Sequence, residues 1–199
     1  MKPFQIGAVL FPGFELLDVF GPLELFAMLD DRVSNTMLAQ TAGEVVSAQG
    51  PRAIADASLA DAARYDLILV PGGIGTRKAV QDERLIAQLI SHSEAARYVT
   101  SVCTGASLLA RAGLLDDREA TTNKLVFDWV TTQGPRVRWV RRARWVVDGK
   151  FWTSSGVTAG MDVALAIIQH AFGREAAEDS ARKAEYVWNE DSTHDPFAS

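Results

Sequence analysis

Short apolar runs alternate with amphipathic segments along this chain of 199 residues. Apolar runs closed by Pro, Gly or a small residue are typical of buried strands, and they occur at residues 4–11, 65–70 and 98–102. Apolar residues at helical spacing predict helices over residues 16–29, 82–95, 104–112, 124–132, 158–172 and 175–188. In the first of these, Gly21-Pro22 indicates either one kinked helix or two consecutive helices.

Three shorter extended pieces resemble edge strands, at residues 37–41, 45–48 and 53–55. Residues 137–153 alternate as a hairpin that turns at Asp148-Gly149, and residues 189–199 are expected to form a tail. Strands that alternate with helices predict an α/β fold with an open, mainly parallel sheet covered on both faces. Since no repeat, linker or low-complexity stretch divides the sequence, we expect a single domain over residues 1–199.

Composition narrows the range of functions. Hydrophobic residues make up 48% of the chain, charged residues 23%, and the formal net charge is -5. This acidic balance disfavours nucleic acid and membrane surfaces as partners, because both require a surplus of basic side chains. No apolar run reaches the ~18 residues of a membrane helix, and the signal-peptide pattern is absent from the amino end. The single cysteine excludes an internal disulfide and a multi-cysteine metal site, so we expect a cytoplasmic protein.

Cys103 stands where the predicted strand at 98–102 meets the predicted helix at 104–112. Small flanking residues let the chain turn sharply, which would place the thiol at the carboxyl edge of the sheet, where ligands bind in this fold class. The amides of the helix amino terminus are expected to lower the pKa of the thiol below its usual value of about 8.5 and favour the thiolate. The alternative is a small buried hydrophobic residue, as most free cysteines are.

Asp18 is the candidate proton donor or acceptor for this thiol. It lies within the apolar stretch 16–20, where desolvation would raise its pKa until it holds a proton near neutrality. The alternative is a solvated or helix-capping aspartate. A third element is the glycine turn at residues 71–75, because glycines let backbone N–H groups point into a pocket and stabilise developing negative charge.

Other patterns are less specific. Ser155 and Val157 follow an apolar run and either line the pocket or act as simple turn and cap residues. Arginines alternate with Trp and Val over residues 136–145, which we interpret as one face of a hairpin rather than a nucleic-acid surface. We expect exposed side chains at His92 and His194, and a packed or capping role for His170.

Taken together, these motifs resemble the DJ-1/PfpI superfamily. The resemblance runs in order along nearly the whole chain and rests on Asp18, Gly21-Pro22-Leu23-Glu24, Val70-Pro71-Gly72-Gly73, Ser101-Val102-Cys103-Thr104-Gly105-Ala106, Gly113-Leu114-Leu115, Ala120-Thr121-Thr122 and Gly156-Val157-Thr158-Ala159-Gly160-Met161-Asp162. Within it the chain is most similar to the isocyanide hydratase (isonitrile hydratase) branch and to the sensor domains of AraC-type regulators. The resemblance implies a flavodoxin-like fold and a homodimer. It further implies that Cys103 is the nucleophile, that Asp18 is its carboxylic partner, and that Thr104 and the Gly72 and Gly73 amides belong to the pocket.

The resemblance also implies a reaction with a small-molecule substrate. The thiolate would attack the terminal carbon of an isocyanide, Asp18 would supply a proton, and water would then convert the thioimidate to an N-substituted formamide. This chemistry needs no metal or organic cofactor. Two alternatives remain, a glyoxalase-like or deglycase-like enzyme acting on α-oxoaldehydes, and a non-enzymatic redox sensor that uses an oxidisable thiolate.

Three positions depart from other branches of the superfamily. Its proteases have a histidine directly after the cysteine, where this chain has Thr104, so we do not expect peptide hydrolysis. Many relatives have histidine after Ala-Thr-Thr, where this chain has Asn123, which rules out a cysteine–histidine relay from that position. The glyoxalase-like branches commonly carry glutamate at the position of Asp18, so the shorter side chain favours the hydratase branch.

Overall fold

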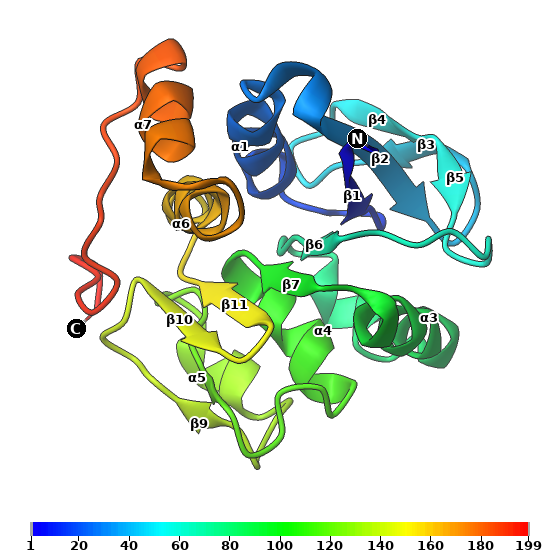
Figure 1. Ribbon diagram of the computed structural model, residues 1–199. Coiled ribbons are helices and arrows are strands. Elements are labelled where there is room, and N and C mark those ends of the chain that lie inside the picture. The colour runs from blue at the N-terminus through cyan, green and yellow to red at the C-terminus, as the bar shows by residue number, and fades with distance from the viewer. Residues whose placement is uncertain (1, 199) are drawn as a thin grey trace.

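A seven-stranded sheet forms the central layer of the computed structural model, which describes residues 2–198 (Figure 1). The strands lie in the order β10-β11-β7-β6-β1-β2-β5. Their bounds are β1 Phe4–Val9, β2 Val33–Ala39, β5 Ala57–Ser58, β6 Leu67–Val70, β7 Tyr98–Ser101, β10 Trp145–Asp148 and β11 Phe151–Ser154. All neighbours are parallel except β10 and β11. The predicted mainly parallel sheet is confirmed, and the order β2-β1-β6-β7-β11 is that of flavodoxin-like folds.

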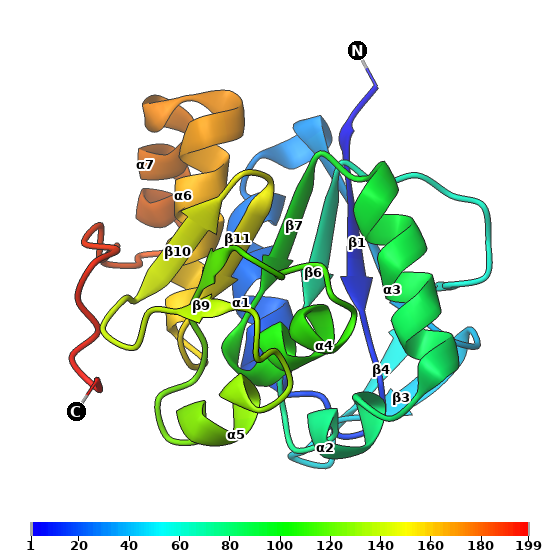
Figure 2. The ribbon, with the colours of Figure 1, turned by 90° about the horizontal axis from the view of Figure 1, so that it is seen from below.

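Helices cover both faces of this sheet (Figures 1 and 2). One face carries α1 Leu16–Ala27, α6 Ala159–Phe172 and α7 Arg174–Lys183, and the other carries α3 Glu83–Ala95, α4 Ala106–Arg111 and α5 Phe127–Thr131. The short elements α2 Thr76–Ala79, η1 Asp30–Arg32 and η2 Cys103–Gly105 lie in the connections. Every residue of β6 and of β7 is buried, because both faces of the sheet are covered, and this explains the continuous apolar sequence of β6.

The segment predicted as one kinked helix or two helices is a single helix, α1, with Pro22 inside it. Proline lacks the N–H that would bond the carbonyl of Asp18 four residues earlier, yet the helix continues to Ala27. Gly21 lies where α1 meets α6, since a Cβ at this position would come within 3.0 Å of Met161 Cγ. The glycine therefore allows the two helices to approach closely.

Several boundaries differ from the sequence prediction. β2 begins at Val33 and pairs with β1 on one side and with β5 on the other, so this strand is not an edge strand. The strands β3 Gly43–Val46 and β4 Arg52–Ala55 form a separate antiparallel pair. The predicted hairpin over 137–153 is wrong in its first half, because β9 Arg138–Trp139 pairs in parallel with β8 Glu119–Ala120. Its second half is correct, since β10 and β11 pair around the turn at Gly149.

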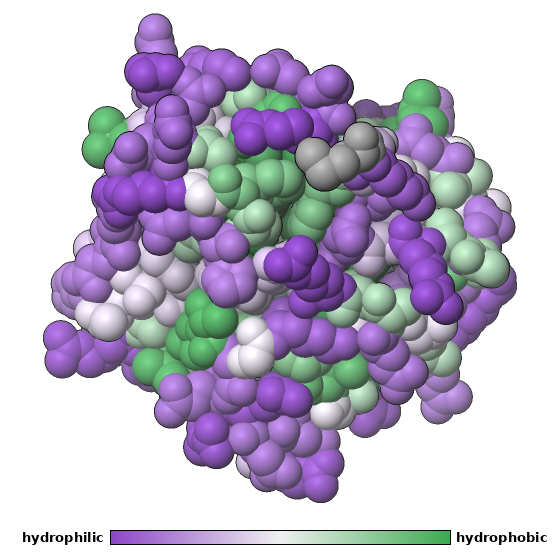
Figure 3. Space-filling model, in the orientation of Figure 1, coloured by the Kyte–Doolittle hydropathy of each residue, from purple (hydrophilic) through white to green (hydrophobic). Residues whose placement is uncertain are grey.

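The surface is mostly polar on the side shown in Figure 3, with separate apolar patches. Exposed large apolar side chains are Leu17, Phe20, Val46, Ile54, Ile74, Leu125, Val147, Val187 and Phe197. Within residues 2–198, no helix is both long enough and apolar enough to span a bilayer.

A buried ion pair ties the chain beyond α7 to the domain. Asp162 Oδ2 lies 2.6 Å from Arg144 Nη2, and both side chains are buried. Asp162 Oδ1 accepts hydrogen bonds from the Tyr186 hydroxyl and from the Asn189 N–H, each at 2.9 Å. The carboxylate therefore joins α6 to the start of β10 and to the segment that follows α7. The helix α7 ends at Lys183 and is shorter than the predicted helix over residues 175–188.

Removing the Asp162 carboxylate leaves the Arg144 guanidinium buried without its main partner. We expect Asp162→Ala to lower the free energy of unfolding by about 3–5 kcal/mol in urea denaturation. The control is Glu44→Ala, which breaks an ion pair with Arg52 in which both side chains are 63% exposed, and which should cost less than about 1 kcal/mol. Equal losses in the two variants would contradict the structural role of Asp162.

Candidate active site

Cys103 occupies a strained turn between β7 and α4. Its φ is +57°, in the left-handed region that residues other than glycine rarely adopt. The turn is held from two sides, because the Cys103 N–H donates to Ser155 O at 3.0 Å and the Thr122 hydroxyl donates to Cys103 O at 2.7 Å. The predicted joint between strand and helix is thus confirmed, and it directs the side chain toward the carboxyl end of the sheet.

Asp18 comes to the same place from the first turn of α1. Its side chain is fully buried, and Oδ2 accepts a hydrogen bond from the Gly72 N–H at 2.8 Å. Oδ1 is also buried and has no hydrogen-bond partner within residues 2–198. Burial raises the pKa of Asp18 to about 7, while the Gly72 bond and the neighbouring Cys103 oppose this rise. Asp18 is therefore the buried, neutral-range acid that its apolar sequence context predicts.

The thiol has a different ionisation behaviour from the one that the sequence predicts. Burial, followed by the negative charge of Asp18, raises the pKa of Cys103 to about 12. Three donors oppose this rise: the backbone N–H groups of Thr104 and Val157, and the Asn123 amide, whose Nδ2 lies 3.2 Å from Sγ. The prediction of a low thiol pKa is wrong, because burial and the nearby carboxylate outweigh these donors.

The two raised pKa values describe one pair that shares a proton. Below pH 7 both groups are protonated, and between about pH 7 and 12 the pair holds a single proton. The resting form has Asp18 charged and Cys103 neutral. When the proton moves to Asp18, the repulsion that disfavours the thiolate disappears, so a thiolate and a carboxylic acid form together. The pair can thus supply a nucleophile and an acid at the same moment.

The glycine turn positions Asp18 instead of offering free donors. The Gly72 N–H is bonded to Asp18, and the Gly73 N–H donates to Thr104 Oγ1 at 3.0 Å. Both amides that were expected to face a substrate are therefore engaged within the protein. A Cβ on Gly72 would come within 2.5 Å of the Thr104 nitrogen and 2.9 Å of Asp18 Oδ2, so only glycine fits between these groups.

Thr104 contributes to the site through its backbone as well as its hydroxyl. Its N–H points at the Cys103 sulfur. Its hydroxyl oxygen lies between the Gly73 N–H and the Thr76 hydroxyl, 3.2 Å from Thr76 Oγ1. The hydroxyl therefore fixes the glycine turn against the cysteine, whereas the N–H stabilises charge on the sulfur.

A cavity of 290 Å³ lies beside the sulfur. It is lined by Asn123, Lys124, Leu125, Ser155, Gly156, Val157, Thr158 and Phe197. Asn123 and Val157 are thus in contact with both the cavity and Sγ, although Cys103 itself is only 6% exposed. Of the two alternatives for Ser155 and Val157, the structure supports the pocket lining.

Asn123 is the residue that sequence reasoning missed. Its position was noted for the histidine it lacks, whereas its amide donates directly to the sulfur. A Cβ on Gly156 would come within 2.6 Å of Asn123 Nδ2, so this glycine leaves room for the amide. The pairing of Asn123 with Gly156 was not apparent because the two residues lie on separate connections.

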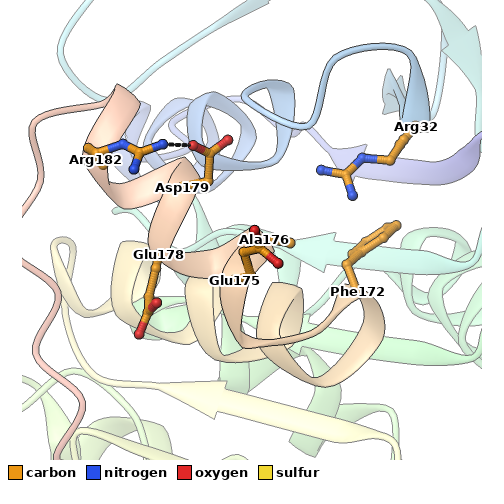
Figure 4. A pocket seen from close by; sticks show the side chains of 7 residues that line it. All are labelled: Arg32, Phe172, Glu175, Ala176, Glu178, Asp179 and Arg182. Carbon is orange, nitrogen blue, oxygen red and sulfur yellow. Dashed lines mark hydrogen bonds and ion pairs between the residues drawn. The ribbon is translucent and has the colours of Figure 1, made fainter.

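The remaining candidates do not form a second reactive centre. A cavity of 410 Å³ is lined by Arg32, Phe172 and five residues of α7, among which Arg182 pairs with Asp179 (Figure 4).

His92 is buried and bonded to Leu59 O, so its predicted exposure is wrong, while His194 is exposed as predicted. The His170 ring lies against those of Tyr98 and Trp152, as expected for a packed residue. Within residues 2–198, no group of three or more His, Cys, Asp or Glu side chains is arranged to hold a metal ion.

Comparison with known proteins places this site in a family context. A sequence model described as the DJ-1/PfpI family matches residues 5–170. The chain is 36% identical over 183 residues to an isonitrile hydratase of Pseudomonas putida, covering 92% of this chain and 78% of that protein. It is 30% identical over 179 residues to the HTH-type transcriptional regulator GbdR of Pseudomonas aeruginosa, covering 87% of this chain but only 48% of the regulator.

Solved structures agree with the fold. A THiJ/PfpI family protein from Pseudomonas syringae has a TM-score of 0.85 at 28% identity, covering 95% of this chain and 77% of that one. Drosophila melanogaster DJ-1beta has a TM-score of 0.82 at 19% identity, covering 94% of this chain and all of that one. The flavodoxin-like architecture is therefore shared, even where the sequences have diverged widely.

Because the pair shares a proton, the alkylation rate of Cys103, the single cysteine of the chain, should depend on pH in a specific way. The reactive form, thiolate with protonated Asp18, has lost one of the pair's two protons. We therefore expect the rate of reaction with iodoacetamide to rise up to about pH 7 and then to stay level until much higher pH. In Asp18→Asn the rate should instead keep rising with pH beyond 7. Identical profiles for the two proteins would contradict proton sharing.

Proposed function

The chain belongs to the DJ-1/PfpI family, and on that premise we propose that it is a cysteine-dependent hydratase that converts an isocyanide to an N-substituted formamide. The observation that carries the proposal is the buried Asp18 carboxyl, with a pKa of about 7 and one unbonded oxygen, beside the Cys103 thiol. The similarity to an isonitrile hydratase supports the same reaction. We also propose that the protein is a cytoplasmic homodimer. Light scattering of the purified protein would test the dimeric state.

The first half of the reaction forms a bond between sulfur and carbon. The thiol proton moves to Asp18, and Sγ attacks the terminal carbon of R–N≡C. Asp18 then returns the proton to that carbon, which gives the thioimidate R–N=CH–S–Cys103. The N–H groups of Thr104 and Val157 and the Asn123 amide stabilise the charge on sulfur before it attacks.

The second half adds water and releases the thiol. Asp18, now charged, takes a proton from a water molecule as the oxygen attacks the thioimidate carbon, and it passes this proton to the nitrogen. The resulting intermediate, R–NH–CH(OH)–S–Cys103, expels the Cys103 thiolate while Asp18 takes the hydroxyl proton. This leaves R–NH–CHO, and the proton on Asp18 returns to the thiolate, so one water has been added in total. The strained, fixed turn keeps Sγ in place for both bond formation and bond cleavage.

The alternatives fit the site less well. An oxidation sensor depends on an accessible, low-pKa thiolate, whereas Cys103 is buried and its pKa is raised to about 12. An enzyme acting on α-oxoaldehydes also needs a cysteine nucleophile, so a direct comparison of substrates is required. Turnover of methylglyoxal without turnover of any isocyanide would replace the hydratase proposal with this alternative.

The roles of Cys103 and Asp18 can be tested by measuring, with chromatography, the formamide produced from an aryl isocyanide. We expect Cys103→Ala to abolish turnover and Asp18→Asn to reduce kcat by about 10²–10⁴-fold, the usual contribution of a positioned acid. Asn123→Ala should reduce kcat by about tenfold, because one donor to the charged sulfur is lost. The matched control is Glu24→Gln, an exposed carboxylate on the same helix as Asp18, which should leave turnover unchanged. Undiminished turnover in Cys103→Ala would eliminate the covalent route.

A further inference from the structure

The segment after α7 returns to the candidate active site. The chain leaves α7 at Lys183 and runs along the domain toward β10 (Figure 1). Residues 189–198 have no regular helix or strand, and yet Asp195 is only 1% exposed. Phe197, two residues later, lines the cavity beside Cys103. A stretch expected to be a tail is therefore packed onto the protein, and it contributes an aromatic ring to the site.

Polar contacts hold this segment at Ser192 and at Asp195. The Arg144 N–H donates to Ser192 O at 2.8 Å, and the Asp195 N–H donates to Arg142 O at 2.7 Å. The Asp195 carboxylate lies 3.7 Å from Arg144 Nη1, and both side chains are buried. Arg144 is held in turn by Asp162. The position of Asp195 is thus fixed by the backbone and by a buried charge network.

Asp195 in turn fixes the backbone of Phe197. Its Oδ1 accepts a hydrogen bond from the Phe197 N–H at 2.8 Å, which closes a short turn between the two residues. Phe197 is nevertheless 73% exposed. A large apolar side chain is therefore fixed at its backbone but largely uncovered, and it would lose water-exposed surface if an apolar group entered the cavity.

The other residues that line the cavity also favour an apolar ligand group. Leu125 and Val157 supply further apolar surface, and no carboxylate lines the cavity among the described residues. The single charged lining residue is Lys124, whose ammonium donates to Thr121 Oγ1 and to Ala143 O, each at 2.7 Å. Since these bonds engage the ammonium within the protein, the charge is not free to select an anionic group.

We propose that Phe197, together with Leu125 and Val157, forms the subsite for the organic group of the substrate, and that Asp195 is the positioning residue for this ring. The inference rests on the proposed hydratase function and gives it a substrate class, isocyanides with an aromatic or bulky apolar group. An isocyanide is linear at nitrogen and carbon, so a carbon in contact with Sγ places the organic group in the adjoining space. That space is the cavity that Asn123 and Val157 share with the sulfur.

Alkylation of Cys103 tests the subsite without relying on isocyanide turnover. Iodoacetamide and its N-phenyl derivative, iodoacetanilide, carry the same reacting group and differ only in the ring. We expect the native protein to favour iodoacetanilide over iodoacetamide more strongly than a free cysteine derivative does. Phe197→Ala should reduce this preference about tenfold, and Phe197→Leu should retain part of it.

Asp195→Ala tests the positioning role of Asp195, and Val187→Ala is the matched control. Asp195→Ala, which removes the acceptor of the Phe197 N–H, should reduce the preference in the same direction as Phe197→Ala, while the rate with iodoacetamide changes little. Val187→Ala removes another exposed apolar side chain, 90% exposed, that does not line the cavity, and it should leave the preference unchanged. In turnover assays, Phe197→Ala should raise KM for an aryl isocyanide about tenfold, with little change in kcat and little change for methyl isocyanide.

The outcomes separate this inference from the hydratase proposal. Equal effects of Phe197→Ala on both alkylating reagents would overturn the subsite, whatever the isocyanide assays give. An equal effect of Val187→Ala and Phe197→Ala on the preference would also overturn it. A selective loss for iodoacetanilide without any turnover of isocyanides would support the apolar subsite and reject the hydratase.

Discussion

Two ionisable groups, the Asp18 carboxyl and the Cys103 thiol, are too deeply buried and too close together to carry negative charge at the same time. Asp18 raises the pKa of Cys103, whereas the thiol lowers the pKa of Asp18, so the pair behaves as one acid over the physiological pH range. This constraint makes a buried thiol useful. A thiolate is costly while Asp18 is charged, but it becomes accessible when Asp18 accepts the proton, and that proton is then available to the substrate.

The architecture supplies this pair from two distant parts of the sequence. β1 and β7 are separated in the sheet only by β6, so the elements that follow them end at the same edge. Asp18 enters on α1, and Cys103 stands on the strained turn after β7. Gly72, which follows β6 between them, bonds to Asp18 and leaves no space for a side chain. Three adjacent parallel strands thus determine the distance between acid and nucleophile.

Sequence reasoning predicted the features that depend on local pattern. The apolar runs of β6 and β7 indicated buried parallel strands, and an acid within an apolar stretch indicated the raised pKa of Asp18. The direction of the Cys103 pKa could not be predicted, because it depends on burial and on a charge contributed by another element. The same holds for the Asn123 contact and for the path of residues 189–198, which are fixed by tertiary packing and by buried ion pairs. The Gly72 and Gly73 amides were recognised as donors, but their acceptors, Asp18 and Thr104, lie far away in sequence.

The most direct test of this account is the titration of the Asp18 carboxyl itself. Carbon-13 labelling of aspartate, with the Asp18→Asn spectrum used to identify the resonance, would follow its chemical shift as a function of pH. We expect a midpoint near pH 7 in the native protein, and a higher midpoint in Cys103→Ala, where the thiol no longer lowers the pKa of Asp18. A midpoint near 4 in the native protein would contradict the account, because Asp18 would then be an ordinary carboxylate with no proton to share.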